Sequence, residues 1–256
     1  MRKLFALCAV LVLAAAVAPI GTAFAAGGSK PKAHDWSFDG ITGTYDRAAL
    51  RRGLQVYLEV CASCHSLNLV AYRHLGNVGF TADEIKAIAA EFEVEDGPNE
   101  EGEMFSRPAR PADRFPVPFA NDQEARAANS GALPPDLSVI NKARKGGANY
   151  IHALLSGYRE EAPDGFDLME GMSYNDYFAG KQIAMPPPLT EDGVEYADGT
   201  TASVEQMSAD VTIFLEWASE PGMEDRKRLG IKVLLFLLVL TAMLFALKRK
   251  IWADLH

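Results

Sequence analysis

Residues 61–65 read Cys-Ala-Ser-Cys-His, and these residue types at this spacing suit one kind of chemistry. C-x-x-C-H is the attachment pattern of c-type haem. The thiols of Cys61 and Cys64 would add across the two vinyl groups of the porphyrin, with a spacer that sets the sulfurs apart to match them. His65 would then ligate the iron as its proximal ligand. The motif therefore predicts one covalently attached haem c.

Other chemistries also use a C-x-x-C pair. A redox-active pair of the thioredoxin type would follow a strand in a βαβ pattern, which this sequence lacks. A zinc site would need further cysteines or paired histidines. The third cysteine, Cys8, lies in the N-terminal leader considered below, and the histidines form no H-x3–5-H pair. A disulfide between Cys61 and Cys64 remains open for an exported protein.

Met185 is the strongest candidate for the second axial ligand of the iron. It precedes three consecutive prolines, 186–188, which hold the backbone extended and remove N–H groups that would otherwise need partners. Methionine ligation raises the reduction potential relative to two histidines. A pair of histidines that includes His74 or His152 is the alternative. Five other methionines are expected to fill the core: Met104, Met169, Met172, Met207 and Met223.

Helical periodicity and capping signals predict the elements that must position these residues. Apolar residues at helical spacing predict a helix over 45–63 that presents the cysteine pair near its end. Thr81 and Ser203 begin helices over 81–93 and 203–219, each with Glu or Gln three residues later to complete a capping box. Shorter helices are expected at 122–129, 137–145 and 148–156, a long surface loop at 95–121 and mostly irregular chain at 157–199.

Both ends of the sequence indicate a relation to a membrane. Residues 1–25 combine a basic start, an apolar run and an Ala-Phe-Ala ending, which together predict a secretory signal peptide; a retained anchor is the alternative. Residues 231–247 are almost wholly apolar and sit at the lower length limit for a spanning helix. A buried core helix is the alternative for that segment.

These segments divide the chain into a signal peptide (1–25), an exported haem domain (26–225) and a C-terminal anchor (226–256). Basic residues flank the apolar span on both sides, so they do not decide its orientation. The signal peptide does decide it. We expect a single-pass protein of a bacterial inner membrane, with the haem domain in the periplasm and the C-terminus in the cytoplasm.

The distribution of charge bears on possible partners. The chain has a net charge of −9; because Arg2, Lys3 and the tail's net +6 are excluded, residues 26–225 carry about −17. Such a domain does not suit nucleic acid or anionic lipid, and it suits a basic partner. Seven acids between residues 91 and 103 contain no basic residue among them. They are either a solvated loop or a surface that steers a basic protein.

The sequence resembles the cytochrome c1 family, the haem-bearing subunit of the cytochrome bc1 complex, over nearly all of the mature chain. Any one of the shared segments is weak, but their order is specific. They are CASCHS (61–66), VAYRHL (70–75), VEDGPNE (94–100), GEMF (102–105), ARAAN (125–129), GALPPDLS (131–138), AR (143–144), GG (146–147), LLSGY (154–158) and IAMPPPL (183–189).

The resemblance implies a mostly α-helical, cytochrome c-like haem domain with long irregular loops and one C-terminal transmembrane helix. It implies that His65 and Met185 are the axial ligands, that Pro135 packs on the ring, and that Arg144 and Tyr150 approach the propionates. The extra disulfide of some bacterial members has no cysteines here to form it.

The resemblance also implies a role in electron transport. One electron at a time would pass from the Rieske iron–sulfur protein through the haem to a soluble cytochrome c, in a complex with cytochrome b. The rivals are an anchored cytochrome of a terminal oxidase, a peroxidase-like protein with an open iron position and an anchored disulfide-bonded adaptor.

Overall fold

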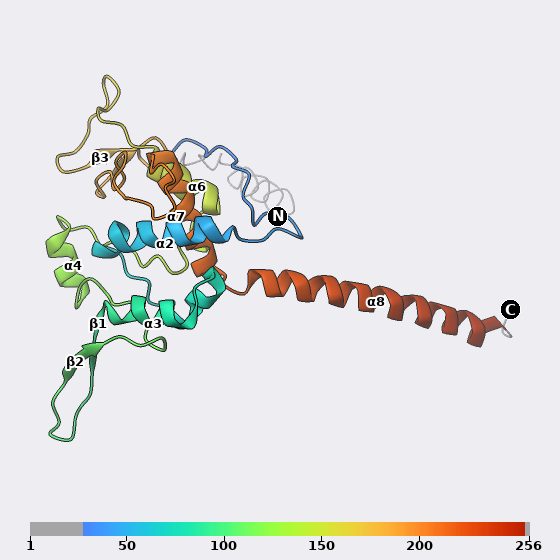
Figure 1. Cartoon of the computed structure of the whole chain (residues 1–256). Coiled ribbons are helices and arrows are strands. Elements are labelled where there is room, and N and C mark those ends of the chain that lie inside the picture. The colour runs from blue at the N-terminus through green and yellow to red at the C-terminus, as the bar shows by residue number, and fades with distance from the viewer. Residues whose placement is uncertain (1–27, 254–256) are drawn as a thin grey trace, which may run out of the picture.

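The computed structural model describes residues 28–253, and its elements are mostly helices (Figure 1). The predicted signal peptide, 1–25, lies outside the described residues. In chain order the elements are α2 (Arg47–Glu59), η1 (Cys61–Ser63), η2 (Tyr72–Val78), α3 (Ala82–Ala90), β1 (Glu93–Asp96), β2 (Phe105–Pro108), α4 (Asp122–Ala128), α5 (Ile140–Ala143), α6 (Gly147–Ser156), β3 (Ser173–Tyr174), β4 (Gln182–Ile183), α7 (Val204–Ser219) and α8 (Met223–Trp252).

The core forms where α2 crosses α7. Both helices begin at a side-chain cap: Asp46 accepts from the first turn of α2, and Ser203 accepts from the backbone N–H of Gln206. A Cβ on Gly53 would lie 2.1 Å from the carbonyl oxygen of Asp210, so only glycine lets the two backbones come this close. Large apolar side chains fill the space around the crossing: Leu50, Leu54, Tyr57, Phe214 and Trp217.

A buried ion pair fixes the register of the same crossing. Asp210 is 1% exposed and accepts from Arg52 through both carboxylate oxygens, at 2.8 and 3.0 Å. Gln206, expected to complete a capping box, instead donates to Asp210 at 2.9 Å. A paired and hydrogen-bonded charge of this kind constrains how the helices meet more than it adds stability.

Most expected helices are present, with shifted ends. The first begins at Arg47 and its α-helical part ends at Glu59, before the cysteines. Thr81 makes the predicted capping box with Glu84. The expected loop over 95–121 was partly wrong, because β1 and β2 pair there as an antiparallel hairpin. Two methionines expected in the core are exposed, Met104 by 55% and Met169 by 57%.

The C-terminal helix α8 leaves the domain and extends away from it (Figure 1). Its 30 residues include an 18-residue window of mean hydropathy 2.5, none of it buried. In the stretch 28–253 it is the one helix long and apolar enough to cross a membrane. The alternative of a buried core helix for 231–247 is therefore wrong, since this apolar surface is covered by no part of residues 28–253.

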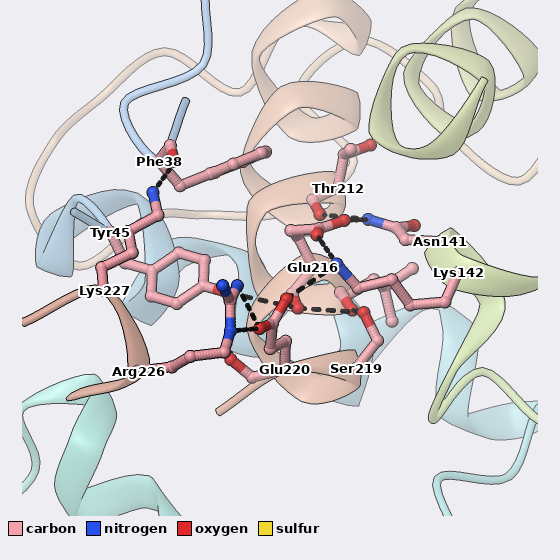
Figure 2. Close-up of polar contacts among 11 residues, drawn as sticks. Phe38, Tyr45, Asn141, Lys142, Thr212, Glu216, Ser219, Glu220, Arg226 and Lys227 are labelled. Atoms are coloured by element: carbon pink, nitrogen blue, oxygen red, sulfur yellow. Dashed lines mark hydrogen bonds and ion pairs between the residues drawn. The ribbon is translucent and has the colours of Figure 1, made fainter. Parts of the chain in front are cut away.

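A polar network joins the start of α8 to the domain (Figure 2). The ammonium group of Lys142, on α5, donates to Glu216 of α7 at 2.8 Å and to Glu220, which directly follows α7, at 2.9 Å. Glu220 also accepts from Arg226 of α8. Lys227 of α8 donates to the carbonyl oxygens of Phe38 and Gly43 in the N-terminal segment. The first turns of α8 therefore bond directly to the residue after α7 and to the N-terminal segment, and Glu220 links them to α5 through Lys142.

Candidate haem site

The two cysteines lie on one tight turn directly after α2. The backbone N–H groups of Cys64 and His65 both donate to the carbonyl oxygen of Cys61, at 3.1 and 2.9 Å. This turn, η1, follows the C-terminus of α2, so the packing of α2 against α7 positions the motif. Both thiols are free, which excludes the disulfide in this structure.

The thiol of Cys61 is unsuited to thioredoxin-type redox chemistry. The residue as a whole is half-buried, but removal of its thiol from water, and to a smaller degree the neighbouring Cys64, raises its pKa to about 12. A redox-active cysteine needs a lowered pKa, because the thiolate is the nucleophile. The environment therefore favours a structural or covalently modified sulfur.

The imidazole of His65 is oriented by a backbone carbonyl. Its Nδ1 lies 2.7 Å from the carbonyl oxygen of Pro135, and Nδ1–H donates to that oxygen. Burial lowers the pKa of His65, which favours the neutral ring. With Nδ1 used in this way, the lone pair on Nε2 is left for a metal, which is how ligating histidines are commonly held.

A carboxylate that sequence reasoning missed connects the two segments beneath His65. Asp136 accepts from the hydroxyl of Ser66, the N–H of Asn68 and the N–H of Ser138, each at 2.8 Å. Burial alone would raise the pKa of Asp136, but these hydrogen bonds outweigh it and lower the pKa. Asp136 lies in the GALPPDLS segment (131–138), in which a role was predicted only for Pro135.

Met185 lies on a strap held by a tyrosine. It is half-buried and follows β4, ahead of the proline run. The hydroxyl of Tyr158 donates to the carbonyl oxygen of Met185 at 3.1 Å. Burial raises the pKa of Tyr158 well above its usual range, so the phenol stays protonated and able to donate. Tyr158 belongs to the LLSGY segment (154–158), and this role was not predicted from the sequence.

Arg144 and Tyr150 lie on either side of a double-glycine turn. Arg144 ends α5, and Tyr150 is half-buried on α6. Gly146 and Gly147 have φ angles of 99° and 54°, which glycine adopts without strain. Burial raises the pKa of Tyr150, while the positive charge of Arg144 acts in the opposite direction.

The structure thus gathers the predicted residues into two groups. In one, the His65 ring bonds to the carbonyl oxygen of Pro135; in the other, the Tyr158 hydroxyl bonds to the carbonyl oxygen of Met185. Arg144 and Tyr150 lie on either side of the double-glycine turn before α6. Within 28–253 no hydrogen bond joins the groups. Neutral imidazole, unbridged thiols on one turn and a strapped thioether are the donor set of a c-type haem, so the residues fit that cofactor.

The alternative histidine ligands have other partners. His74 Nδ1 accepts from the N–H of Ala71 at 3.2 Å. His152 stacks on His34 with ring centroids 5.0 Å apart, and its Nε2 lies 3.3 Å from a carboxylate oxygen of Glu205. In the described part of the chain, no three His, Cys, Asp or Glu side chains are grouped to hold a bare metal ion.

Comparison with known proteins gives a consistent result. The model of the cytochrome C1 family matches residues 36–255. Cytochrome c1 of Rhodospirillum rubrum is 51% identical over 261 residues, which cover 95% of this chain and 96% of that protein. A mitochondrial cytochrome c1 haem protein of Arabidopsis thaliana is 53% identical, covering 87% of this chain and 72% of its own length.

A further relative is a larger polypeptide. Cytochrome b/c1 of Bradyrhizobium diazoefficiens is 47% identical over 90% of this chain, and the match covers 36% of that protein. The family match spans the C-x-x-C-H turn, the Asp136 segment, the Met185 strap and the apolar helix. The chain belongs to the cytochrome c1 family.

Proposed function

We propose that this chain, an electron-transfer subunit of a cytochrome bc1 complex, carries one electron at a time on a haem c bound to Cys61 and Cys64, with His65 and Met185 as axial ligands. The observation that carries the proposal is the η1 turn, where both free thiols and a His65 ring held through Nδ1 occur together in a family member. The haem iron supplies the reversible one-electron change.

The chain's own task is to hold the ligands still. The Pro135 carbonyl fixes the ring orientation and protonation of His65, and Asp136 ties the two segments around it together. The Tyr158 hydroxyl and three prolines restrain the Met185 backbone. Fixed ligands need little reorganisation when the charge on the iron changes, and a methionine ligand keeps the potential high.

Three further residues complete the proposed site. Pro135 would pack on the porphyrin from the side of His65, to which its carbonyl oxygen is bonded. Arg144, at the end of α5, and Tyr150, on α6, would donate to a propionate, where Arg offers two parallel hydrogen bonds. Both are donors at neutral pH, which suits a carboxylate partner.

The partners follow from the family and from α8. Electrons arrive from the Rieske iron–sulfur protein and leave to a soluble cytochrome c, while cytochrome b is the neighbour in the membrane. Support for that neighbour comes from a relative named cytochrome b/c1. Residues 1–25 act as the signal peptide, 26–225 form the periplasmic domain, and α8 anchors the domain to an inner membrane with a short cytoplasmic tail. No nucleic acid is a partner.

Replacement of Met185 by leucine in the assembled complex tests the ligand set. Leucine keeps the volume but cannot ligate, so the low-spin spectrum should change, the reduction potential should fall and the reduced haem should bind carbon monoxide. Met172→Leu is the matched control, since Met172 is a half-buried methionine of the preceding loop. An unchanged spectrum in Met185→Leu would remove Met185 as a ligand.

Replacement of both cysteines by alanine tests covalent attachment. Haem staining after denaturing electrophoresis should be lost in Cys61→Ala/Cys64→Ala and retained in the wild type. A wild-type band without stain would reject the haem and leave the adaptor. Carbon monoxide binding to the wild type would favour the peroxidase-like alternative.

A further inference from the structure

A buried carboxylate on α7, which the haem proposal does not use, bonds to two consecutive residues of α5 (Figure 2). Glu216 is 8% exposed. Its Oε2 accepts from the side-chain amide of Asn141 at 2.9 Å, and its Oε1 accepts from the ammonium group of Lys142 at 2.8 Å. Both carboxylate oxygens are therefore used to hold one short helix against α7.

The position of α5 depends on these contacts, because the helix is too short to be stable by itself. It has four residues, Ile140–Ala143, and no side chain caps its start at Val139. A single helical turn is unstable alone, since its nucleation costs more than its few hydrogen bonds return. Asn141 is 2% exposed and also donates to the carbonyl oxygen of Thr212 at 3.2 Å, so α7 supplies the hydrogen bonds that fix α5.

Arg144 follows α5 directly, two residues after Lys142. Its backbone is extended, with φ −118° and ψ 135°. The residue is exposed, and its guanidinium donates to the carbonyl oxygen of Ala143 at 3.3 Å but pairs with no carboxylate within residues 28–253. Its remaining donors can therefore bind an anion from outside the chain, and the place where they do so is decided by α5.

The link between the two helices is ionic. Burial alone would lower the pKa of Lys142, but its hydrogen bonds to Glu216 and Glu220 outweigh burial and raise the pKa, so the ammonium group stays charged at neutral pH. A buried ion pair adds little net stability, because both charges lose their hydration. Its hydrogen bonds are directional, however, and restrict how the two helices meet, which favours a role in positioning.

We propose that Glu216 is a positioning residue of the haem site, which holds α5 where the Arg144 guanidinium meets a haem propionate. This inference rests on the proposed function, in which Arg144 donates to a propionate. A guanidinium held beside the haem favours the reduced form, because the oxidised form carries one more positive charge. Glu216 thereby helps to keep the reduction potential high without contact with the cofactor.

The reduction potential of the assembled complex tests this role. Arg144→Gln removes the cation and should lower the equilibrium constant for reduction about fivefold, or about 40 mV at 59 mV per tenfold for one electron. Glu216→Gln keeps the size of the side chain but can no longer accept through two oxygens, so α5 should loosen. The constant should then fall about twofold, or about 20 mV on the same scale.

The sign of this shift separates positioning from the loss of charge. Loss of the negative charge of Glu216 by itself would favour the reduced haem and raise the potential. A fall in Glu216→Gln therefore reports the position of Arg144. Glu224→Gln is the matched control, because Glu224 is a half-buried carboxylate that pairs with Arg47 and makes no bond to α5; its potential should not fall.

A double-mutant cycle separates positioning from a general loss of stability. If Glu216 acts through Arg144, Glu216→Gln should cause no further fall in the Arg144→Gln background. Lys142→Gln, at an exposed position, supplies a second cycle should Glu216→Gln fail to fold. In that cycle the fall should be smaller when Arg144 has already been replaced.

An unchanged or raised potential in Glu216→Gln would overturn the inference, and so would an equal fall with and without Arg144. If Arg144→Gln itself leaves the potential unchanged, the proposed propionate contact fails together with this inference. A fall in Arg144→Gln alone would keep that contact and reject only the role of Glu216. The haem stain of the wild type reports on the proposed cofactor independently of these shifts.

Discussion

At the scale of single residues, the proposed iron ligands are positioned through backbone carbonyl groups. The carbonyl of Pro135 accepts from His65, and the carbonyl of Met185 accepts from Tyr158. A carbonyl on a proline-rich segment moves little, because proline fixes φ. Each proposed ligand is therefore bonded to, or part of, a stretch of chain that moves little. This restricts the movement of the side chain that would bind the iron.

Tyr158→Phe isolates one of these restraints. The change removes the hydroxyl that donates to Met185 and keeps the ring. A hydrogen bond of this kind contributes about 1 kcal/mol, so the strap should open about fivefold more often. Imidazole, which competes with methionine for ferric haem, should bind about fivefold more tightly. Tyr174→Phe, in strand β3, is the control and should bind imidazole as tightly as the wild type does.

The sequence predicts the ligands better than it predicts what supports them. The roles of Cys61, Cys64 and His65 are predicted by their spacing within five consecutive residues. Asp136 and Tyr158 act across 68 and 27 residues, on Asn68 and Met185. Such contacts depend on how the segments fold back together, and no local pattern encodes them.

At the scale of elements, the crossing of α2 and α7 positions η1, the turn that carries Cys61 and is followed by Cys64. Gly53→Ala would place a methyl group 2.1 Å from the Asp210 carbonyl oxygen, so the helices must separate. Overpacking of this kind costs about 1–3 kcal/mol, and we expect a lower denaturant midpoint by that amount. Gly230→Ala, where nothing lies within 4 Å, is the control; alanine favours the helix there, so this change should not lower the midpoint.

The β1–β2 hairpin shows why one element escaped prediction. Helix starts were found because Thr81 and Ser203 are capping residues followed by apolar periodicity. The side chains of the hairpin strands are mostly exposed, and in β1 exposed and half-buried side chains alternate. Strands without an apolar face give no alternating signal, and the Pro, Glu and Gly content of the stretch favoured a loop.

A largely buried arginine, Arg107, links the two strands of that hairpin through ion pairs, which make the stability of the hairpin sensitive to acid. Arg107 bonds to Asp96 of the partner strand and to both carboxylate oxygens of Asp113, at 2.6 and 3.1 Å. The hydrogen bonds from Arg107 lower the pKa of both carboxyl groups. Their contribution is complete above the unfolded value of about 4 and is lost as the pH falls through the lower folded values.

Hydrogen exchange measures this effect. After correction for intrinsic rates, protection of the β1 and β2 amides should stay constant from pH 8 to about pH 5 and decrease below about pH 4. Arg107→Gln should show the acid behaviour already at neutral pH. Arg110→Gln should follow the wild type, and equal protection in all three proteins would show that the ion pairs do not hold the hairpin.

At the scale of the whole molecule, charge and anchoring act together. The polar network of Figure 2 joins α8 to the domain, so if α8 spans a membrane as proposed, the domain would not turn freely above it. The hairpin extends from the body of the domain (Figure 1). A fixed orientation means that a soluble partner meets the same face at each encounter, and a strongly acidic domain attracts a basic partner over a distance.

Steering by the hairpin is the prediction that belongs to this scale. Four of its glutamates, Glu95, Glu100, Glu101 and Glu103, are exposed and pair with no Lys or Arg within residues 28–253. Their replacement by glutamine should slow the reaction with a basic soluble cytochrome c roughly tenfold at low salt. The variant and the wild type should converge near 1 M salt, where the screening length falls to about 3 Å.

The matched variant removes four acids from another loop, Glu160, Glu161, Asp164 and Asp167, all of which are exposed. If the hairpin is the docking surface, this variant keeps most of the wild-type rate and salt slope. Equal slowing by both variants would mean that the net charge of the domain attracts the partner and that no single surface guides it. Unchanged rates in the hairpin variant would make the acidic run a solvated loop, because a steering field cannot survive the loss of its charges without a change in the rate of encounter.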